Sequence, residues 1–196
     1  VIEGGEYKKT KYYYGSLYYA GISAFHTYYY KEGIKFLSEY LNYTKDLKKK
    51  AKALFYLGIC EYNQGYDYEK NKKLEWDKTF AKLEKLYLQN KQKFSPDDIK
   101  EFYFKYFELL GYSDKKPEEI FKIYNNAYVL LHQEKLRAEV IIKLIDRYYY
   151  NYEHPEKFSA LVDKFSASYP NSSELPSIYY HLGQFYNRFE ETLKKE

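Results

Sequence analysis

The chain has 196 residues, enough to bury a core as one domain or as a row of short repeats. Its net charge is only +4, and of its 32 basic residues only Arg137, Arg147 and Arg188 are arginine. This modest, lysine-based charge argues against a nucleic-acid binder, which favours concentrated basic patches and arginine forks. The single cysteine, Cys60, excludes an internal disulfide and is expected to be a small buried helix residue.

The longest uncharged run, residues 12–30, is almost long enough to cross a membrane. It carries eight tyrosines together with serine, threonine and histidine, and such hydroxyl-rich sequence inserts poorly into hydrocarbon. We therefore expect no transmembrane segment in this chain, and we expect any membrane tether to lie outside it.

Apolar residues spaced three and four apart predict about nine helices along the chain. Proline followed by acidic residues, at Pro96, Pro117 and Pro155, marks the start of three of them. No run alternates with period two for long enough to predict a strand, so we expect no sheet. The predicted helices span residues 7–28, 31–43, 47–64, 68–89, 96–111, 117–132, 134–152, 155–168 and 174–194.

A repeated phrase organises these helices. Tyr179, Leu182, Gly183 and Tyr186 reproduce the spacing W-x2-L-G-x2-Y, with tyrosine in place of tryptophan. This phrase resembles the first helix of a tetratricopeptide repeat, in which residues three and four apart share a helix face and the glycine lets the second helix approach closely. The resemblance implies that Gly183 packs at a helix crossing.

Weaker copies of the phrase occur upstream, at Leu57 and Gly58 and again at Ala20 and Gly21. Gly58 is therefore also expected to pack at a helix crossing. The resulting spacings between repeats exceed the standard length of the family. The equivalent position along the chain is placed at Gly21, Gly58, Phe104, Asp146 and Gly183.

The resemblance implies an all-α fold, a short superhelical array of antiparallel helix pairs forming a tetratricopeptide-like α-solenoid of about nine helices. Residues 1–13 are expected to form an N-terminal lead-in and the start of the first helix, and residues 14–196 the repeat domain. The expected units span residues 14–46, 47–92, 96–133, 134–170 and 174–196.

Signatures of catalysis do not accompany this pattern. The four histidines, His26, His132, His154 and His181, are never spaced as ligands on one helix face, and each is expected to be an ordinary surface or packing residue. Neither G-x-G-x-x-G nor a phosphate-binding loop occurs. We therefore expect no enzyme activity, no cofactor and no metal site.

The expected function is that of a scaffold or adaptor for another protein. In the tetratricopeptide family the first helix of each pair lines a concave face, and the resemblance implies a groove of aromatic and basic residues there that binds a partner peptide or helix. The resemblance places the following residues in that groove: Tyr18, Ile22, His26, Lys52, Tyr62, Asn63, Lys143, Arg147, Tyr150, Asn151, Tyr180, Gln184, Asn187 and Arg188.

Two alternatives stay open. The lysine run at Lys48, Lys49, Lys50 and Lys52 is either a solvated helix start or a site for nucleic acid or another anionic surface. The stretch 165–186 is similar to a joint in bacterial cell-envelope lipoproteins with such repeats, such as the helical subunit of the barrel-assembly machinery. That similarity implies a periplasmic or cell-envelope location, with the cytoplasm as the alternative.

Overall fold

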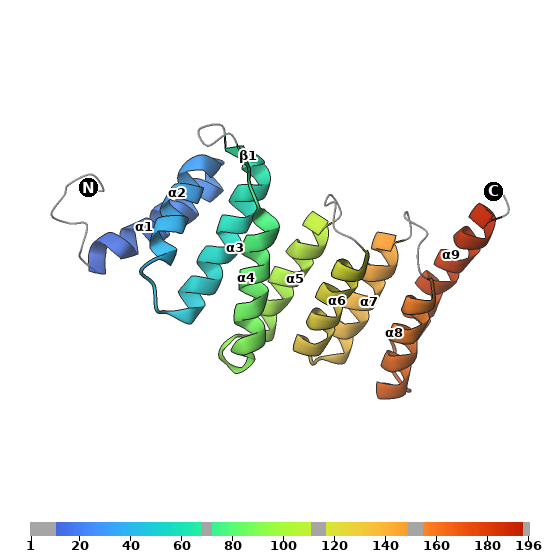
Figure 1. Ribbon diagram of the computed structural model, residues 1–196. Helices are drawn as coiled ribbons and strands as arrows, with labels where there is room; N and C mark the ends of the chain where they lie inside the picture. The colour runs from blue at the N-terminus through green and yellow to red at the C-terminus, as the bar shows by residue number, and fades with distance from the viewer. Residues whose placement is uncertain (1–10, 68–71, 111–116, 149–154, 194–196) are drawn as a thin grey trace. The chain divides into compact units, whose positions relative to one another are not determined.

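The computed structural model describes residues 11–67, 72–110, 117–148 and 155–193. The chain divides into two compact units, residues 1–95 and 96–196. Nine α-helices follow one another along the described residues (Figure 1). The prediction of an all-α protein with nine helices is therefore confirmed, whereas the superhelical twist of the array stays a prediction.

The first unit is built from consecutive helices that pack in sequence order, α1 on α2, α2 on α3 and α3 on α4. Asp46 caps α3, because its carboxylate accepts hydrogen bonds from the backbone N–H groups of Lys48 and Lys49 at 3.0 and 3.1 Å. The helices of this unit are α1 (Lys11–His26), α2 (Tyr30–Leu41), α3 (Leu47–Gln64), α4 (Trp76–Gln89) and the short 3₁₀-helix η2 (Lys91–Lys93).

Two glycines bring the helices of the first unit close together. A Cβ atom on Gly21 would lie 2.6 Å from Cγ of Leu37 in α2, and a Cβ atom on Gly58 would overlap the ring of Phe80 in α4. Both Leu37 and Phe80 are fully buried. The prediction that Gly58 packs at a helix crossing is confirmed, since only a residue without a side chain leaves room for the ring.

A short antiparallel ribbon, β1 (Tyr66–Asp67) paired with β2 (Lys72–Lys73), lies between α3 and α4. The predictions of no sheet and of an earlier start for α4 are therefore wrong, because α4 begins at Trp76. Gly65 explains the difference, since it ends α3 with a φ of 67°, which favours glycine. Its carbonyl then accepts a hydrogen bond from the N–H of Leu74 at 3.0 Å, beyond the ribbon.

The second unit also consists of consecutive helices, with α6 packed on α7, α7 on α8 and α9, and α8 on α9. Three of them begin with a proline, as predicted, because the first helical position needs no backbone N–H donor. The helices are α5 (Pro96–Leu110), α6 (Pro117–Leu130), α7 (Glu134–Tyr148), α8 (Pro155–Ser168) and α9 (Leu175–Leu193).

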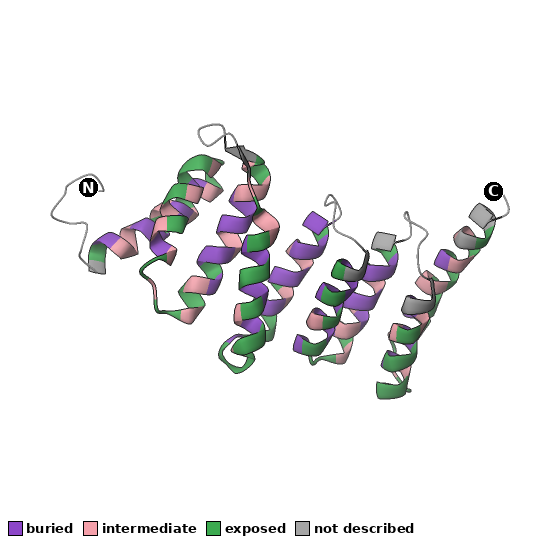
Figure 2. Cartoon of the chain, in the orientation of Figure 1, coloured by how far each residue is buried: buried purple, intermediate pink, exposed green. Residues whose placement is uncertain are grey.

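Aromatic rings take many of the core positions in the second unit. Phe107 of α5 stacks on Tyr124 of α6 with ring centroids 3.8 Å apart, and Phe158 of α8 lies 4.8 Å from Phe185 of α9. Figure 2 shows buried residues on one side of these helices and exposed residues on the other. This amphipathic pattern explains why short helices with many polar residues stay together.

The repeat register predicted from the sequence does not hold in the second unit. Gly183 is exposed, and apart from its own helix turn no described atom lies within 4 Å of a Cβ atom built on it, so the prediction that it packs at a helix crossing is wrong. Asp146 at the equivalent position is also exposed, and Phe104 is only half-buried. The spacing therefore located the helices correctly but misjudged which of their faces are covered.

Candidate functional site

In the first unit, two of the predicted binding residues belong to the interior. Tyr18 is buried, its ring lies 5.1 Å from that of Tyr40, and burial raises its pKa to about 12. Ile22 is half-buried and packs against the same core cluster. Both residues support the packing of α1 rather than present a surface to a partner.

The other predicted residues of the first unit lie nearer the surface. His26 and Lys52 are exposed, whereas Tyr62 is half-buried with its ring edge-on to Trp76 at 5.6 Å. The amide of Asn63 is exposed but donates a hydrogen bond to a backbone carbonyl one turn earlier in α3, at 2.9 Å. His26 and Lys52 are thus the two members of this set best placed to meet a partner.

On the second unit, Phe104 of α5 organises two lysines. The ammonium nitrogens of Lys100 and Lys143 lie 5.3 and 5.0 Å from the centroid of its ring, within the range of a cation–π contact. Lys100 also forms an ion pair with Glu139 of α7 at 3.5 Å. The contact with Phe104 places Lys143, a predicted binding residue, in an exposed position beside α5.

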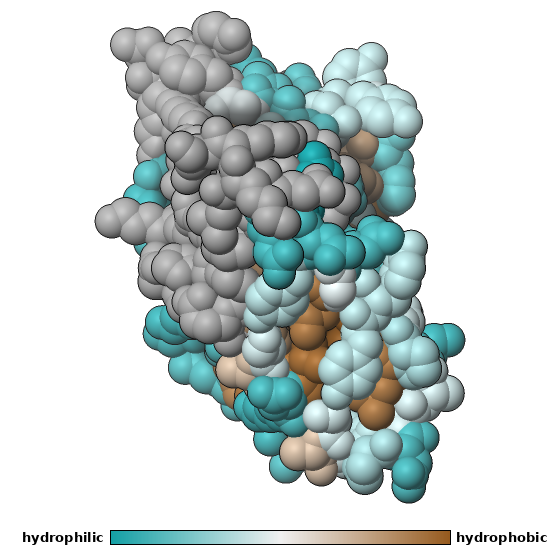
Figure 3. Space-filling view, turned by 90° about the vertical axis from the view of Figure 1, so that its right-hand side faces the viewer, coloured by the Kyte–Doolittle hydropathy of each residue, from teal (hydrophilic) through white to brown (hydrophobic). Residues whose placement is uncertain are grey.

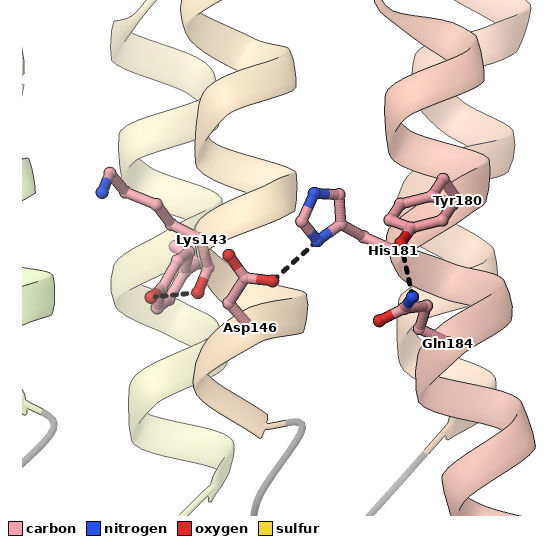
Figure 4. A network of polar contacts seen from close by, with 6 residues as sticks. Lys143, Asp146, Tyr180, His181 and Gln184 are labelled. Atoms are coloured by element: carbon pink, nitrogen blue, oxygen red, sulfur yellow. Dashed lines mark hydrogen bonds and ion pairs between the residues drawn. The ribbon is translucent and has the colours of Figure 1, made fainter.

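Polar side chains of α7 and α9 continue this surface (Figure 4). Oδ1 of Asp146 lies 2.8 Å from Nδ1 of His181, and the amide of Gln184 donates a hydrogen bond to the hydroxyl of Tyr180 at 2.6 Å. In Figure 4, His181 points from α9 toward Asp146, whereas Lys143 points away from this pair. Tyr180 is 63% exposed although its hydroxyl accepts the hydrogen bond from Gln184.

We call this surface the polar face of the second unit. Three of its residues were predicted from the sequence to bind a partner, one on α7 and two on α9. The other three were not predicted to bind. Its members are Phe104, Lys143, Asp146, Tyr180, His181 and Gln184.

The remaining predicted residues add little to this surface as described. Arg147 belongs to α7, but its side chain lies outside the described residues, and Tyr150 and Asn151 lie outside them altogether. On α9, Asn187 is exposed and Arg188 is half-buried. The predicted place of Arg147, Tyr150 and Asn151 in the groove therefore stays a prediction.

A groove between α6 and α8 was not predicted from the sequence. Its volume is about 570 Å³, and its lining carries two lysines and two asparagines but no carboxylate. The only sequence signal for it is the placing of Lys122, Asn125 and Asn126 on successive turns of one helix. The lining residues are Phe121, Lys122, Asn125, Asn126, Ala160, Leu161 and Lys164.

Cys60 is buried, and burial raises the pKa of its thiol to about 12, which confirms the prediction of a buried residue in a helix. Within the described ranges, no group of three or more His, Cys, Asp or Glu residues could hold a metal ion. Over the same ranges, each helix is too short or too polar to cross a membrane.

Comparisons with protein-family models, with curated proteins and with solved structures find no match to this chain. The resemblance to tetratricopeptide repeats therefore depends on the residues of the chain alone.

Proposed function

We propose that this protein is a binding scaffold that holds a segment of another protein on the polar face of its second unit. The observation that carries the proposal is Tyr180, whose ring is largely exposed while its hydroxyl is fixed by Gln184. An exposed aromatic ring held in one orientation loses little conformational entropy when a partner covers it. Tyrosine is for this reason a frequent anchor of protein interfaces.

The neighbours of Tyr180 define the chemistry of the partner segment. Lys143 supplies an exposed positive charge over the ring of Phe104. The pair of Asp146 and His181 supplies hydrogen-bonding groups between Lys143 and Tyr180. A partner segment that fits this surface carries an apolar or aromatic residue that packs on Tyr180 and an acidic residue that pairs with Lys143. Such a segment matches the peptide or helix expected from the sequence.

The wider assignment is also a proposal. The Gly21 and Gly58 crossings support placing the chain among tetratricopeptide-type helical repeats, because both occur in the register of that family's first helix. A location in the bacterial cell envelope is supported by the similarity of residues 165–186 to lipoprotein repeat joints, and the cytoplasm is the alternative.

The test selects ligands for the intact chain from a random dodecapeptide phage library and measures the best peptide by fluorescence anisotropy. We expect acidic peptides with an apolar residue to be enriched. Replacing Tyr180 and Lys143 together by alanine should weaken binding at least about tenfold without lowering the melting temperature. Tyr12→Ala is the matched control, because this tyrosine of α1 is also highly exposed. Equal binding by the double variant and the control would contradict the proposal.

A second candidate function is binding of an anionic ligand such as nucleic acid, and the groove between α6 and α8 favours it. Lys122 and Lys164 are exposed on its rim, and Asn125 and Asn126 add amide groups. A fluorescent single-stranded oligonucleotide would test this function by salt titration, since release of counterions makes such binding fall steeply with salt. Lys122→Ala with Lys164→Ala should reduce the slope, whereas binding to the polar face should respond only mildly to salt.

A further inference from the structure

The lysine run at the start of α3 is a local concentration of positive charge. Residues 45–52 contain five lysines and one acidic residue, so their excess of positive charge equals that of the whole chain. The acidic residue is Asp46, whose carboxylate accepts hydrogen bonds from backbone N–H groups of α3. Four of the lysines are exposed, namely Lys45, Lys48, Lys49 and Lys52. The modest net charge of the chain therefore understates the charge at this place.

A pair of stacked tyrosine rings precedes the run. The ring of Tyr43 lies on that of Tyr14 in α1, with centroids 4.2 Å apart and an angle of 23° between the ring planes. Tyr43 is 49% exposed. Because Tyr14 covers one face of the Tyr43 ring, the exposed part of Tyr43 includes the opposite face. The neighbouring Tyr13 donates a hydrogen bond to the carboxylate of Glu39 at 2.6 Å, so this carboxylate is already engaged.

A contact with α1 brings the lysines next to these rings. The ammonium nitrogen of Lys49 lies 5.9 Å from the centroid of the Tyr18 ring. Tyr18 follows Tyr14 by four residues, so the two share a helix face and lie about 5–6 Å apart. The Tyr43 ring and Lys49 therefore lie against neighbouring turns of α1. We call this surface the lysine–tyrosine face, and its members are Tyr43, Lys45, Lys48 and Lys49.

Other exposed tyrosines have different surroundings. Tyr179 and Tyr180 are 50% and 63% exposed. The view onto the α8–α9 end of the second unit shows apolar atoms uncovered between aromatic side chains (Figure 3). Tyr43 is instead followed in the chain by Lys45 and Lys48. A ring with positive charge beside it fits a ligand that carries negative charge beside a planar group.

We propose that the lysine–tyrosine face binds single-stranded nucleic acid, with a base stacked on the open face of Tyr43 and phosphates at the three lysines. Each nucleotide carries both a planar ring and a negative charge, so one kind of ligand satisfies both features of this surface. The strand is single because the bases of a duplex cover one another's faces. The site belongs to the first unit, and it uses no residue of the polar face or of the groove between α6 and α8.

The probe is a fluorescein-labelled dodecamer of deoxyadenosine, and its binding to the intact chain is measured by fluorescence anisotropy at several salt concentrations. A second dodecamer has the same phosphates but abasic sugars. We expect saturable binding of the first dodecamer and at least about tenfold weaker binding of the second, because a base stacked on an aromatic ring contributes about this much. The comparison separates stacking from charge.

Tyr43→Leu should remove the difference between the two dodecamers, because it leaves no ring for the bases. Tyr43→Phe should bind both dodecamers as the unsubstituted protein does, since it keeps the ring. Tyr29→Leu is the matched control, because this tyrosine is 64% exposed and lies at the opposite end of α2. The melting temperature of each variant shows whether the fold is kept.

Lys48→Gln with Lys49→Gln tests the phosphate contacts. This double variant should reduce the slope of log K against log salt by about 1.4, because each phosphate contact with a single strand adds about 0.7. The cap of α3 is kept, since Asp46 binds backbone N–H groups. Lys91→Gln with Lys93→Gln, two exposed lysines of η2, is the control and should leave the slope unchanged.

Absence of saturable binding of the deoxyadenosine dodecamer would overturn the proposal. Equal binding of the two dodecamers by the unsubstituted protein would also overturn it, and vesicles containing phosphatidylserine would then show whether the lysines bind a lipid surface. Binding that is lost in Lys122→Ala with Lys164→Ala, but kept in the variants of Tyr43 and Lys48, would place nucleic acid in the groove between α6 and α8. That outcome would overturn this proposal while supporting the second candidate function.

Discussion

At Gly58 the missing side chain makes room for a ring, whereas at Gly183 it leaves a helix surface open. The two positions share the same preceding leucine and the same register, so the local sequence does not distinguish them. The difference comes from Phe80, a residue on the next helix. The effect of a substitution at each glycine therefore depends on the covering helix.

We expect Gly58→Ala to lower the free energy of unfolding by about 1–3 kcal/mol, because the new methyl group overlaps the ring of Phe80. Gly183→Ala should raise the free energy of unfolding by about 0.5–1 kcal/mol, because alanine favours the helix and meets no neighbour. Urea denaturation followed by circular dichroism measures both. Changes of the same sign in the two variants would contradict the described packing.

Glu61 is a carboxyl group at the interface of α3 and α4 with one buried oxygen that lacks a hydrogen-bond partner. Burial raises its pKa above 4.5, and this effect outweighs the hydrogen bond to Thr79 and the nearby charge of Lys82, which lower the pKa. The folded protein therefore keeps this proton at a higher pH than the unfolded chain does. The contribution of Glu61 is most favourable below pH 4.5 and is lost as the pH rises through the raised pKa.

We expect Glu61→Gln to raise the melting temperature at pH 7, because glutamine removes the charge while keeping an oxygen for Thr79. The gain should shrink as the pH falls from the raised pKa toward 4.5, and it should be smallest below 4.5, where the glutamate is protonated in both states. Thermal melts of the two proteins across this pH range measure the difference. A gain that does not change with pH would show that the charge of Glu61 is not its cause.

Among the helices of the second unit, Arg137 joins three segments. From α7, its Nε donates hydrogen bonds to the backbone carbonyls of Tyr128 and Leu131 at the end of α6, at 3.0 and 3.1 Å. Its Nη1 donates to the hydroxyl of Tyr169, just after α8, at 3.0 Å. The guanidinium also lies 4.6 Å from the centroid of the Tyr128 ring. A lysine cannot make this set of contacts, because it lacks the planar fork.

Arg137→Lys is therefore expected to lower the free energy of unfolding by about 1–2 kcal/mol despite keeping the charge. Lys135→Arg, at an exposed position two residues earlier, is the control and should change stability by less than about 0.5 kcal/mol. Chemical denaturation measures both variants. A neutral Arg137→Lys would mean that these hydrogen bonds do not contribute to folding.

The helices themselves could be predicted because their signals are local. Pro96, Pro117 and Pro155 each begin a helix as expected, and apolar spacing placed most boundaries within a few residues. The ribbon after Gly65 was missed because it depends on pairing between β1 and β2. Strands of two residues are too short to show the alternating pattern that predicts a strand. Local preference for helix is overridden there by that pairing.

The candidate site was predictable only in part. Lys143, Tyr180 and Gln184 were expected at the surface from the resemblance, whose register assigns positions along a single helix to one face, and all three are exposed. The contact between Asp146 and His181 was not predicted, since it joins residues 35 positions apart and depends on how α7 and α9 pack. The same reason explains why Tyr18 was expected at the surface, although α2 covers it.

At the scale of the whole chain, the two compact units each have an aromatic core of their own. The border between them, at Ser95 and Pro96, coincides with the border between two of the predicted repeat units. Far-ultraviolet circular dichroism should show a helix content well above the roughly one third typical of globular domains. A spectrum dominated by strand would contradict the fold.

The single tryptophan of the chain makes the first unit visible by itself. Trp76 lies 5.6 Å from the ring of Tyr62 and 5.8 Å from that of Phe80, so its emission senses the junction of α3 and α4. The second unit contains tyrosines but no tryptophan. Selectively excited tryptophan fluorescence therefore reports the unfolding of the first unit, whereas ellipticity reports both. A difference between the two curves would reveal whether the halves of the molecule unfold at separate denaturant concentrations.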